Sequence, residues 1–162
     1  MKYTTLGNTD IRISRICMGC MGFGNAQTGQ HSWTVDEETT RTIVKYGLEQ
    51  GINFFDTAIA YQAGTSEMYL GRALKDFAKR EDVVVATKFL PRTADEIENG
   101  ISGCEHVMNS IDISLRHLGM DYVDLYIYHI WDWNTSVEDF LYGLNEVVKA
   151  GKARAIGIAN CF

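Results

Sequence analysis

The chain has 162 residues and a formal net charge of −6, and 46% of its residues are hydrophobic. This length favours one domain with a real hydrophobic core. The acidic balance argues against a general affinity for nucleic acid or for anionic membranes, although an acidic protein can still carry a local site for an anionic cofactor.

The first residues, Met1 to Gly7, contain no apolar stretch of signal-peptide length. No segment approaches the roughly 20 apolar residues that span a bilayer. Cysteines are few and scattered, so a reducing cytoplasm fits best. Cys17 and Cys20 match C-x-x-C, but they end a strand-like run and have no second ligand pair. We therefore expect ordinary strand and loop thiols and no metal site.

In chain order, the first predicted element is a β-hairpin of residues 3–6 and 11–13 around the turn 7–10. A glycine-rich loop follows. Thr34-Val35-Asp36-Glu37 then has the form of a capping box, which predicts a helix capped by Thr34. This helix should end near Gly51, because glycine tolerates the positive φ of a helix terminus.

The rest of the chain alternates short apolar strands with amphipathic helices. The apolar run of residues 13–18 is the first predicted strand, and the four strands that follow it are residues 52–56, 83–88, 123–128 and 153–158. Three helices lie between them, and each has one apolar face: Leu70, Ala73, Leu74 and Phe77; Val107, Ile111, Leu115 and Leu118; and Phe140, Leu144, Val147 and Val148. Ser136 should cap the last helix, and Gly151 should end it.

This alternation predicts an α/β domain with right-handed parallel crossovers over residues 1–162. Two architectures remain open, a doubly wound sheet and a (β/α)8 barrel. The glycines from Gly19 to Gly24 are spaced G-x-x-G-x-G and stand about ten residues before the helix. The dinucleotide fingerprint of a doubly wound sheet is G-x-G-x-x-G and opens directly into a helix, so the spacing favours a barrel loop.

Polar residues end consecutive predicted strands. Asp56, Lys88, His129 and Asn160 are each separated from the next by about one βα unit. Each alone has an ordinary explanation as a cap, a solvated group or a structural histidine. Because the carboxyl ends of parallel strands converge, and barrel active sites lie at that end, four in phase predict a site.

The chemistry that this set suggests is acid catalysis by Tyr61. A tyrosine donates a proton reluctantly at neutral pH, but the ammonium of Lys88 would stabilise the phenolate. Asp56 could hold the lysine, and His129 could offer a hydrogen bond to a substrate oxygen. The set suits proton donation to a carbonyl as a hydride arrives at its carbon, and a nicotinamide would have to supply that hydride.

At these residues the sequence resembles the aldo-keto reductase family. The resemblance is densest over residues 51–71, which contain Gly-Ile-Asn-Phe-Phe-Asp-Thr-Ala-Ile-Ala-Tyr, then Ser66-Glu67 and Leu70-Gly71. Ala86-Thr87-Lys88 matches the lysine motif and Tyr128-His129 the histidine motif. Gly157-Ile158-Ala159-Asn160 resembles the motif that holds the nicotinamide carboxamide.

The resemblance implies a partial (β/α)8 TIM barrel with an N-terminal β-hairpin and about five of eight strands. It implies NADPH-dependent reduction of aldehydes or ketones. Tyr61 would be the general acid, Lys88 its activating neighbour, Asp56 the partner of the lysine and His129 the group that orients the substrate. Asn160, with Cys20, Met21 and Asp56, would touch the NADPH or NADP+ cofactor.

Two departures from the family pattern qualify this expectation. Ala159 stands where the family usually has serine. The sequence stops at Phe162, after the fifth strand, so the segments that stack on the nicotinamide and grip the 2′-phosphate of NADPH would be missing. We expect activity to be impaired or absent, and we expect self-association through exposed barrel edges.

Two other functions remain open. One is a non-catalytic barrel that binds NADPH and a protein partner, as in potassium-channel β subunits. The other is an inactive fragment whose only property is assembly. The four-residue set favours the enzyme, because a scaffold has no need of all four. The sequence does not identify the carbonyl substrate.

Overall fold

The computed structural model describes residues 1–131 and 133–160. An antiparallel hairpin comes first, and a parallel sheet of five strands follows. The strands are β1 (Tyr3–Thr5) and β2 (Arg12–Ser14) in the hairpin, and β3 (Cys17–Gly19), β4 (Phe54–Asp56), β5 (Val84–Phe89), β6 (Val123–Tyr128) and β7 (Ala153–Ile158) in the sheet.

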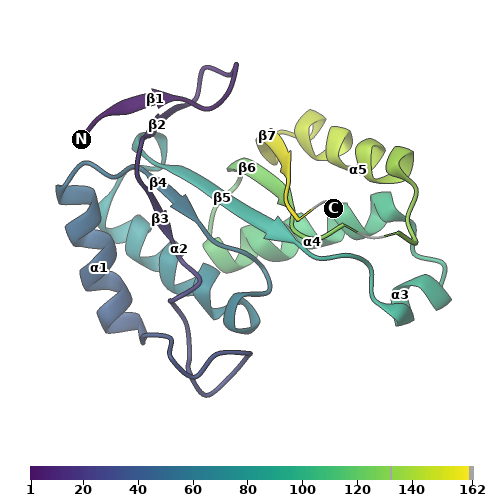
Figure 1. Cartoon of the computed structure of the whole chain (residues 1–162), viewed down its shortest axis with the longest axis horizontal. Coiled ribbons are helices and arrows are strands. Elements are labelled where there is room, and N and C mark those ends of the chain that lie inside the picture. Colours follow the sequence, from purple (N-terminus) through teal and green to yellow (C-terminus); the bar gives the residue numbers. More distant parts are fainter. Residues whose placement is uncertain (132, 161–162) are drawn as a thin grey trace.

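The spatial order of the sheet is β3-β4-β5-β6-β7, the same as the chain order (Figure 1). A doubly wound sheet instead reverses direction at a switch point. Because each crossover is right-handed and moves in the same direction, the connecting helices collect on one face. This is the arrangement of consecutive units of a (β/α)8 barrel, preceded by the expected hairpin.

Five helices accompany the strands in the described residues: α1 (Glu37–Glu49), α2 (Thr65–Phe77), α3 (Ala94–Glu98), α4 (Gly103–Leu118) and α5 (Val137–Lys149). Two short turns, η1 (Tyr61–Gly64) and η2 (Arg80–Asp82), flank α2. The main core lies between the helices and the outer face of the sheet, and it contains Phe55, Leu70, Val85, Ile111 and Tyr126 among others.

The hairpin packs on the other face of the sheet, at the amino end of the strands. Ile11 and Ile13 form a second cluster with Val84. Asn53, just before β4, accepts from the Ser14 amide at 2.6 Å and donates to the Arg12 carbonyl at 3.0 Å. The hairpin therefore covers the end of the sheet opposite the predicted site.

The start of α1 corrects the predicted cap. The N-cap is Asp36, whose carboxylate accepts from the Thr39 amide at 2.9 Å. Thr34 lies outside the helix because its hydroxyl contacts Gln62 Nε2 at 3.2 Å and the His31 carbonyl at 3.4 Å. The end of the helix is as predicted, with Gly51 at φ +84°.

The other helices are largely as predicted. Ser136 caps α5, and the apolar face of α4 is buried throughout. Phe77 and Val148, which we expected to face the core, are 36% and 38% exposed. Phe77 instead packs beneath the cationic side chains of Arg41 and Lys45. The sequence analysis missed α3, which has its own capping box from Thr93 and Glu96.

Candidate active site

Strand register brings the predicted residues to one end of the sheet. Asp56 ends β4 beside Ala86 of β5, and Lys88 lies two residues further along β5, beside Ile127 of β6. His129 follows β6 directly, and its amide donates to the Phe89 carbonyl at 3.0 Å. Because the strands are parallel and neighbouring, these side chains share the carboxyl end of the sheet.

Lys88 is the centre of the site. Its ammonium is 2.8 Å from Asp56 Oδ2, 2.8 Å from the Thr57 carbonyl and 3.1 Å from the Tyr61 hydroxyl. An ammonium has three hydrogens, so these three acceptors use all of them. The residue is only 7% exposed. A nearly buried cation is therefore fixed between a carboxylate and a phenol.

Tyr61 reaches this position because its loop is tied to β5. The amides of Thr57 and Ile59 donate to the carbonyls of Ala86 and Lys88, at 2.9 and 3.0 Å. The chain then turns through η1 in left-handed conformations, with φ +48° at Gln62 and +51° at Ala63. Since Lys88 donates to the phenol oxygen, the phenol hydrogen is left to point elsewhere.

His129 stands edge-on to Tyr61, with ring centroids 5.8 Å apart and an interplanar angle of 81°. Burial lowers the pKa of His129, and the neighbouring Lys88 ammonium lowers it further, against a smaller opposing effect of Asp56. The imidazole is thus neutral near neutral pH. Its Nδ1 is buried and has no hydrogen-bond partner in residues 1–131 and 133–160.

The predicted cofactor residues differ in how accessible they are to a ligand. Asn160 has φ +53°, and its Nδ2 donates to the His129 carbonyl at 2.7 Å. Met21 is 40% exposed beyond the end of β3. Cys20 is fully buried, and its amide and carbonyl are used by Asp56 and Ser66. The structure therefore does not present Cys20 to a ligand, whereas Asp56, Met21 and Asn160 remain partly accessible.

The C-x-x-C thiols are unpaired in the structure. Burial raises the pKa of the Cys20 thiol well above its ordinary value. Burial also raises the pKa of the Cys17 thiol, with a further contribution from Asp56. Both thiols therefore stay protonated and unreactive near neutral pH.

Sequence reasoning missed a buried layer behind the site. Glu67 of α2 is fully buried, and it accepts from the Thr87 hydroxyl at 2.6 Å while lying 2.8 Å from His117 Nδ1. Thr87 immediately precedes Lys88. Ser66 donates to the Cys20 carbonyl at 2.7 Å and contacts the Thr57 hydroxyl at 3.0 Å. These contacts fix the strand ends that carry the site.

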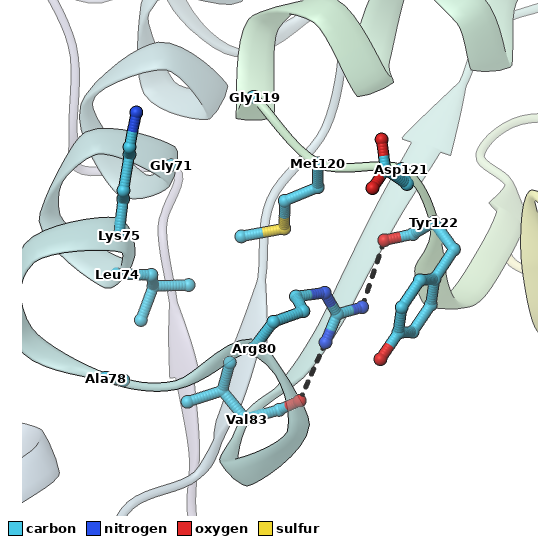
Figure 2. Close-up of a pocket in the computed structure, with 10 residues that line it drawn as sticks. All are labelled: Gly71, Leu74, Lys75, Ala78, Arg80, Val83, Gly119, Met120, Asp121 and Tyr122. Carbon is cyan, nitrogen blue, oxygen red and sulfur yellow. Dashed lines mark hydrogen bonds between the residues drawn. The ribbon is translucent and has the colours of Figure 1, made fainter.

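A cavity of about 250 Å³ lies at the opposite end of the sheet (Figure 2). Its walls come from the ends of α2 and α4 and the starts of β5 and β6, with Leu74, Val83 and Met120 facing the space. Arg80 closes one side by donating to the carbonyls of Val83 and Tyr122. None of the predicted catalytic or cofactor residues lines this cavity.

Among residues 1–131 and 133–160, no group of three or more His, Cys, Asp or Glu side chains is placed to hold a metal ion. In the same part of the chain, no helix has the length and apolar character needed to cross a membrane.

The chain is similar in sequence to known proteins of one family. The family model described as "Aldo/keto reductase family" matches residues 15–161. Norsolorinic acid reductase B of Dothistroma septosporum is 33% identical over 99% of the chain and 42% of its own length. Aldo-keto reductase YhdN of Bacillus subtilis is 35% identical over 99% of the chain and 47% of its own length. The chain spans about half the length of the curated relatives it matches.

Two solved structures have the same fold. A thermostable aldo-keto reductase, Tm1743, in complex with the inhibitor epalrestat aligns with a TM-score of 0.83 and 30% identity, over 99% of this chain and 54% of its own. The holo form of aldo-keto reductase AKR11C1 from Bacillus halodurans aligns with a TM-score of 0.81 and 32% identity, over 99% and 50%. The sheet and hairpin are thus part of a (β/α)8 barrel.

Proposed function

The chain belongs to the aldo/keto reductase family, and from this membership we propose that it carries the proton-donating half of an NADPH-dependent reductase of aldehydes or ketones. Residues 1–162 form the N-terminal portion of one barrel domain in this proposal. The observation that carries it is the Lys88 ammonium, fixed between Asp56 Oδ2 at 2.8 Å and the Tyr61 hydroxyl at 3.1 Å.

The proton moves from Tyr61 in this proposal. Lys88 donates to the phenol oxygen, so the phenol hydrogen can be given to a carbonyl oxygen above the site. As negative charge develops on the phenol oxygen, its hydrogen bond from the ammonium joins two opposite charges and shortens. Asp56 holds the ammonium in place throughout.

His129 directs the substrate. Its lowered pKa keeps the imidazole neutral, so one ring nitrogen can donate a hydrogen bond to the carbonyl oxygen while no second positive charge adds to that of Lys88. The edge-on ring beside Tyr61 places both donors on the same side of the site. Two donors converging on one oxygen polarise a carbonyl before the hydride arrives.

The residues present fit a nicotinamide at this end of the sheet. Asn160 uses its Nδ2 on the His129 carbonyl, and its Oδ1 has no partner in the described residues, so it can accept from a carboxamide. Asp56, at the end of β4, is partly exposed at the same end of the sheet, with 30% of its side chain accessible. When bound, the nicotinamide supplies the hydride that no side chain can give.

The experiment that tests the proposal has two arms. NADPH is titrated into the chain while cofactor fluorescence is followed, and a panel of aldehydes is then added while NADPH consumption is measured. Wild type should bind NADPH, and whatever consumption it supports should be absent from Tyr61→Phe, which should bind NADPH with a similar Kd. Consumption by Tyr61→Phe at the wild-type rate would contradict the role given to Tyr61.

The same experiment separates the two alternatives. A partner-binding barrel, like a potassium-channel β subunit, would bind NADPH and consume none with any aldehyde. An inactive fragment would not bind NADPH even though it is folded by circular dichroism. Consumption that depends on Tyr61 excludes both.

We also propose that the chain self-associates and works in the cytoplasm. Apolar side chains are exposed at helical spacing on α5 and at alternate positions of β7; they are Val137, Leu141, Val148, Ile156 and Ile158, which we call the β7–α5 surface. In the described residues, β7 pairs with β6 alone. An unpaired strand edge beside apolar side chains favours a second copy.

A further inference from the structure

Gln62, the residue after Tyr61, is buried in a loop that is distant in sequence. The residue is 1% exposed, and its carboxamide contacts only the segment that follows β3. We call residues 25–34 the β3–α1 loop. The oxygen Oε1 accepts from the amides of Gln30 and His31, at 3.1 and 2.9 Å.

The nitrogen of the same carboxamide is surrounded by oxygens. Nε2 lies 2.9 Å from the Asn25 carbonyl, 2.8 Å from the Thr28 carbonyl and 2.7 Å from the His31 carbonyl. Two backbone amides on one side and these carbonyls on the other fix which atom is oxygen and which is nitrogen. A neutral carboxamide accepts on one side and shares its two hydrogens among the carbonyls on the other, whereas a carboxylate would turn an oxygen toward the carbonyls.

The loop closes tightly on Gln62. A Cβ at Gly29 would lie 2.6 Å from Gln62 Cα, and a Cβ at Gly24 would lie 2.6 Å from Gln62 Cβ. The Thr65 hydroxyl accepts from the Asn25 amide at 2.9 Å and donates to the Gln62 carbonyl at 2.7 Å. Gly24 and Gly29 both have positive φ, which lets the backbone wrap at this distance.

The backbone at Gln62 is itself held in an unfavourable conformation. Its φ of +48° is left-handed, and so is the +51° of Ala63. This conformation is unfavourable for a residue with a Cβ, and it persists because surrounding contacts over-determine it. For Gln62 those contacts are the hydrogen bonds of its carboxamide, so the same bonds that order the loop also hold the turn that carries Tyr61.

We propose that Gln62 is a positioning residue, whose carboxamide couples the β3–α1 loop to the Tyr61 turn and keeps both in the geometry of the active site. The proposal rests on the proposed function in that Tyr61 is taken as the acid. The β3–α1 loop leaves the same carboxyl end of the sheet as Asp56, and it carries His31 stacked on Trp33 with centroids 4.8 Å apart. Gln62 thus connects the turn that carries Tyr61 to the β3–α1 loop at the same end of the sheet.

Two variants and a matched control test this coupling. Gln62→Glu keeps the size of the side chain but places an oxygen against the carbonyls. Gln62→Gly removes the carboxamide and leaves the left-handed backbone unstrained. Ala63→Gly is the control, because Ala63 has the same backbone conformation but an exposed side chain. The midpoint of global unfolding is also measured for each variant, so that local changes can be separated from a loss of overall stability.

The first readout is amide hydrogen exchange. Both Gln62 variants should raise exchange of residues 25–34 and 61–65 by roughly tenfold or more. In Gln62→Gly the largest change should be at Gln30 and His31, whose amides lose their acceptor. Amides of β5 and β6 should keep their wild-type rates, and Ala63→Gly should leave both segments unchanged. Unchanged exchange in the loop, a rise confined to the loop, or a uniform rise over the whole chain would each overturn the proposal.

The second readout is the kinetics of NADPH consumption. The Gln62 variants should lower kcat by tenfold or more, while the Kd for NADPH stays within threefold of wild type. An unchanged kcat beside faster loop exchange would overturn the coupling to Tyr61. If wild type shows no consumption at all, the proposed function fails, but the exchange measurement still decides whether Gln62 couples the loop and the turn.

Discussion

The two ends of the sheet use the same chemistry, a carboxylate paired with a cation, for different purposes. At the amino end, Asp124 is 1% exposed and accepts from Arg80 at 2.8 Å, from Arg154 at 2.9 Å and from the Val85 amide at 2.9 Å. At the carboxyl end, Lys88 joins Asp56 to Tyr61. Only the second group includes a side chain that can give up a proton.

The difference lies in what remains unused. Both oxygens of Asp124 are bonded, and Arg80 also donates to two carbonyls and covers the Tyr122 ring at 3.9 Å. At the carboxyl end, the phenol hydrogen of Tyr61 and the buried Nδ1 of His129 have no partner in the described residues. Arg80 Nε at the amino end is also without a partner in the described residues, but a guanidinium keeps its protons near neutral pH. An unpartnered phenol and imidazole next to a fixed charge are therefore what distinguish the carboxyl end.

The sharpest test of this comparison removes the cation at the carboxyl end. Lys88→Met should lower the rate of NADPH consumption by roughly 10²–10⁴-fold, because the phenol loses the charge that stabilises its conjugate base. Lys149→Met is the control, since Lys149 contacts Glu146 on the exposed surface of α5. A rate of NADPH consumption by Lys88→Met within tenfold of wild type would contradict the proposal that Lys88 activates Tyr61.

At the amino end the expected loss is stability. Asp124→Asn should lower the free energy of unfolding by about 3–5 kcal/mol, because it leaves two guanidinium groups without their buried counter-charge. Asp10→Asn is the matched control, since Asp10 contacts the same Arg154 at 3.3 Å but its side chain is 90% exposed, and it should cost at most about 1 kcal/mol. Urea unfolding measures both, and equal losses would contradict the comparison.

The β7–α5 surface should affect association rather than folding or catalysis. Ile156→Thr with Ile158→Thr keeps β-branched side chains that suit a strand but removes exposed apolar surface. The double variant should weaken self-association by roughly tenfold, as measured by sedimentation over a range of concentrations. Ile97→Thr, on α3, should leave sedimentation unchanged. A wild-type chain that stays monomeric at every concentration would refute the proposed association.

The smallest expected effect concerns His129 and pH. The pKa of His129 in the folded chain is lower than that of a free imidazole. As the pH falls through the ordinary imidazole pKa, the unfolded chain therefore binds more protons than the folded chain. The free energy of unfolding falls as a result. His129→Gln removes this contribution and should therefore lose less stability than wild type when urea unfolding is repeated at about pH 5 instead of about pH 7. Identical losses in the two proteins would show that Lys88 and burial do not act on His129 as described.

Much of this fold could be predicted because its signals are local. Val84 to Phe89 is apolar on both faces, as expected of a buried parallel strand. The spacing of the strand ends predicted that Asp56 and Lys88 meet, and the place of Tyr61 in the loop after β4, with the chemistry of a phenol beside an ammonium, predicted that Tyr61 joins them. The contacts at 2.8 and 3.1 Å confirm that the three residues meet. Their catalytic roles stay predictions.

What the sequence did not reveal depends on contacts between distant residues. Thr34 loses its predicted role as a cap because Gln62, 28 residues away, lies against its hydroxyl. Glu67 and His117 meet across 50 residues, and Asp124 was unremarkable inside an apolar strand. Propensity and periodicity carry no information about such pairs, although a carboxylate in a buried strand could have been flagged as needing a cation.

The order of the sheet also has a consequence for how the chain folds. Each strand from β4 to β7 pairs with the one just before it in the sequence, so every new strand can dock on an edge that is already complete. No strand must wait for a later segment to be inserted beside it, which limits the loop-closure entropy of each step. Asp56, Tyr61 and Lys88 all lie in β4, β5 and the connection between them, so the proton-donating group can assemble early in synthesis, before β6 and β7 have left the ribosome.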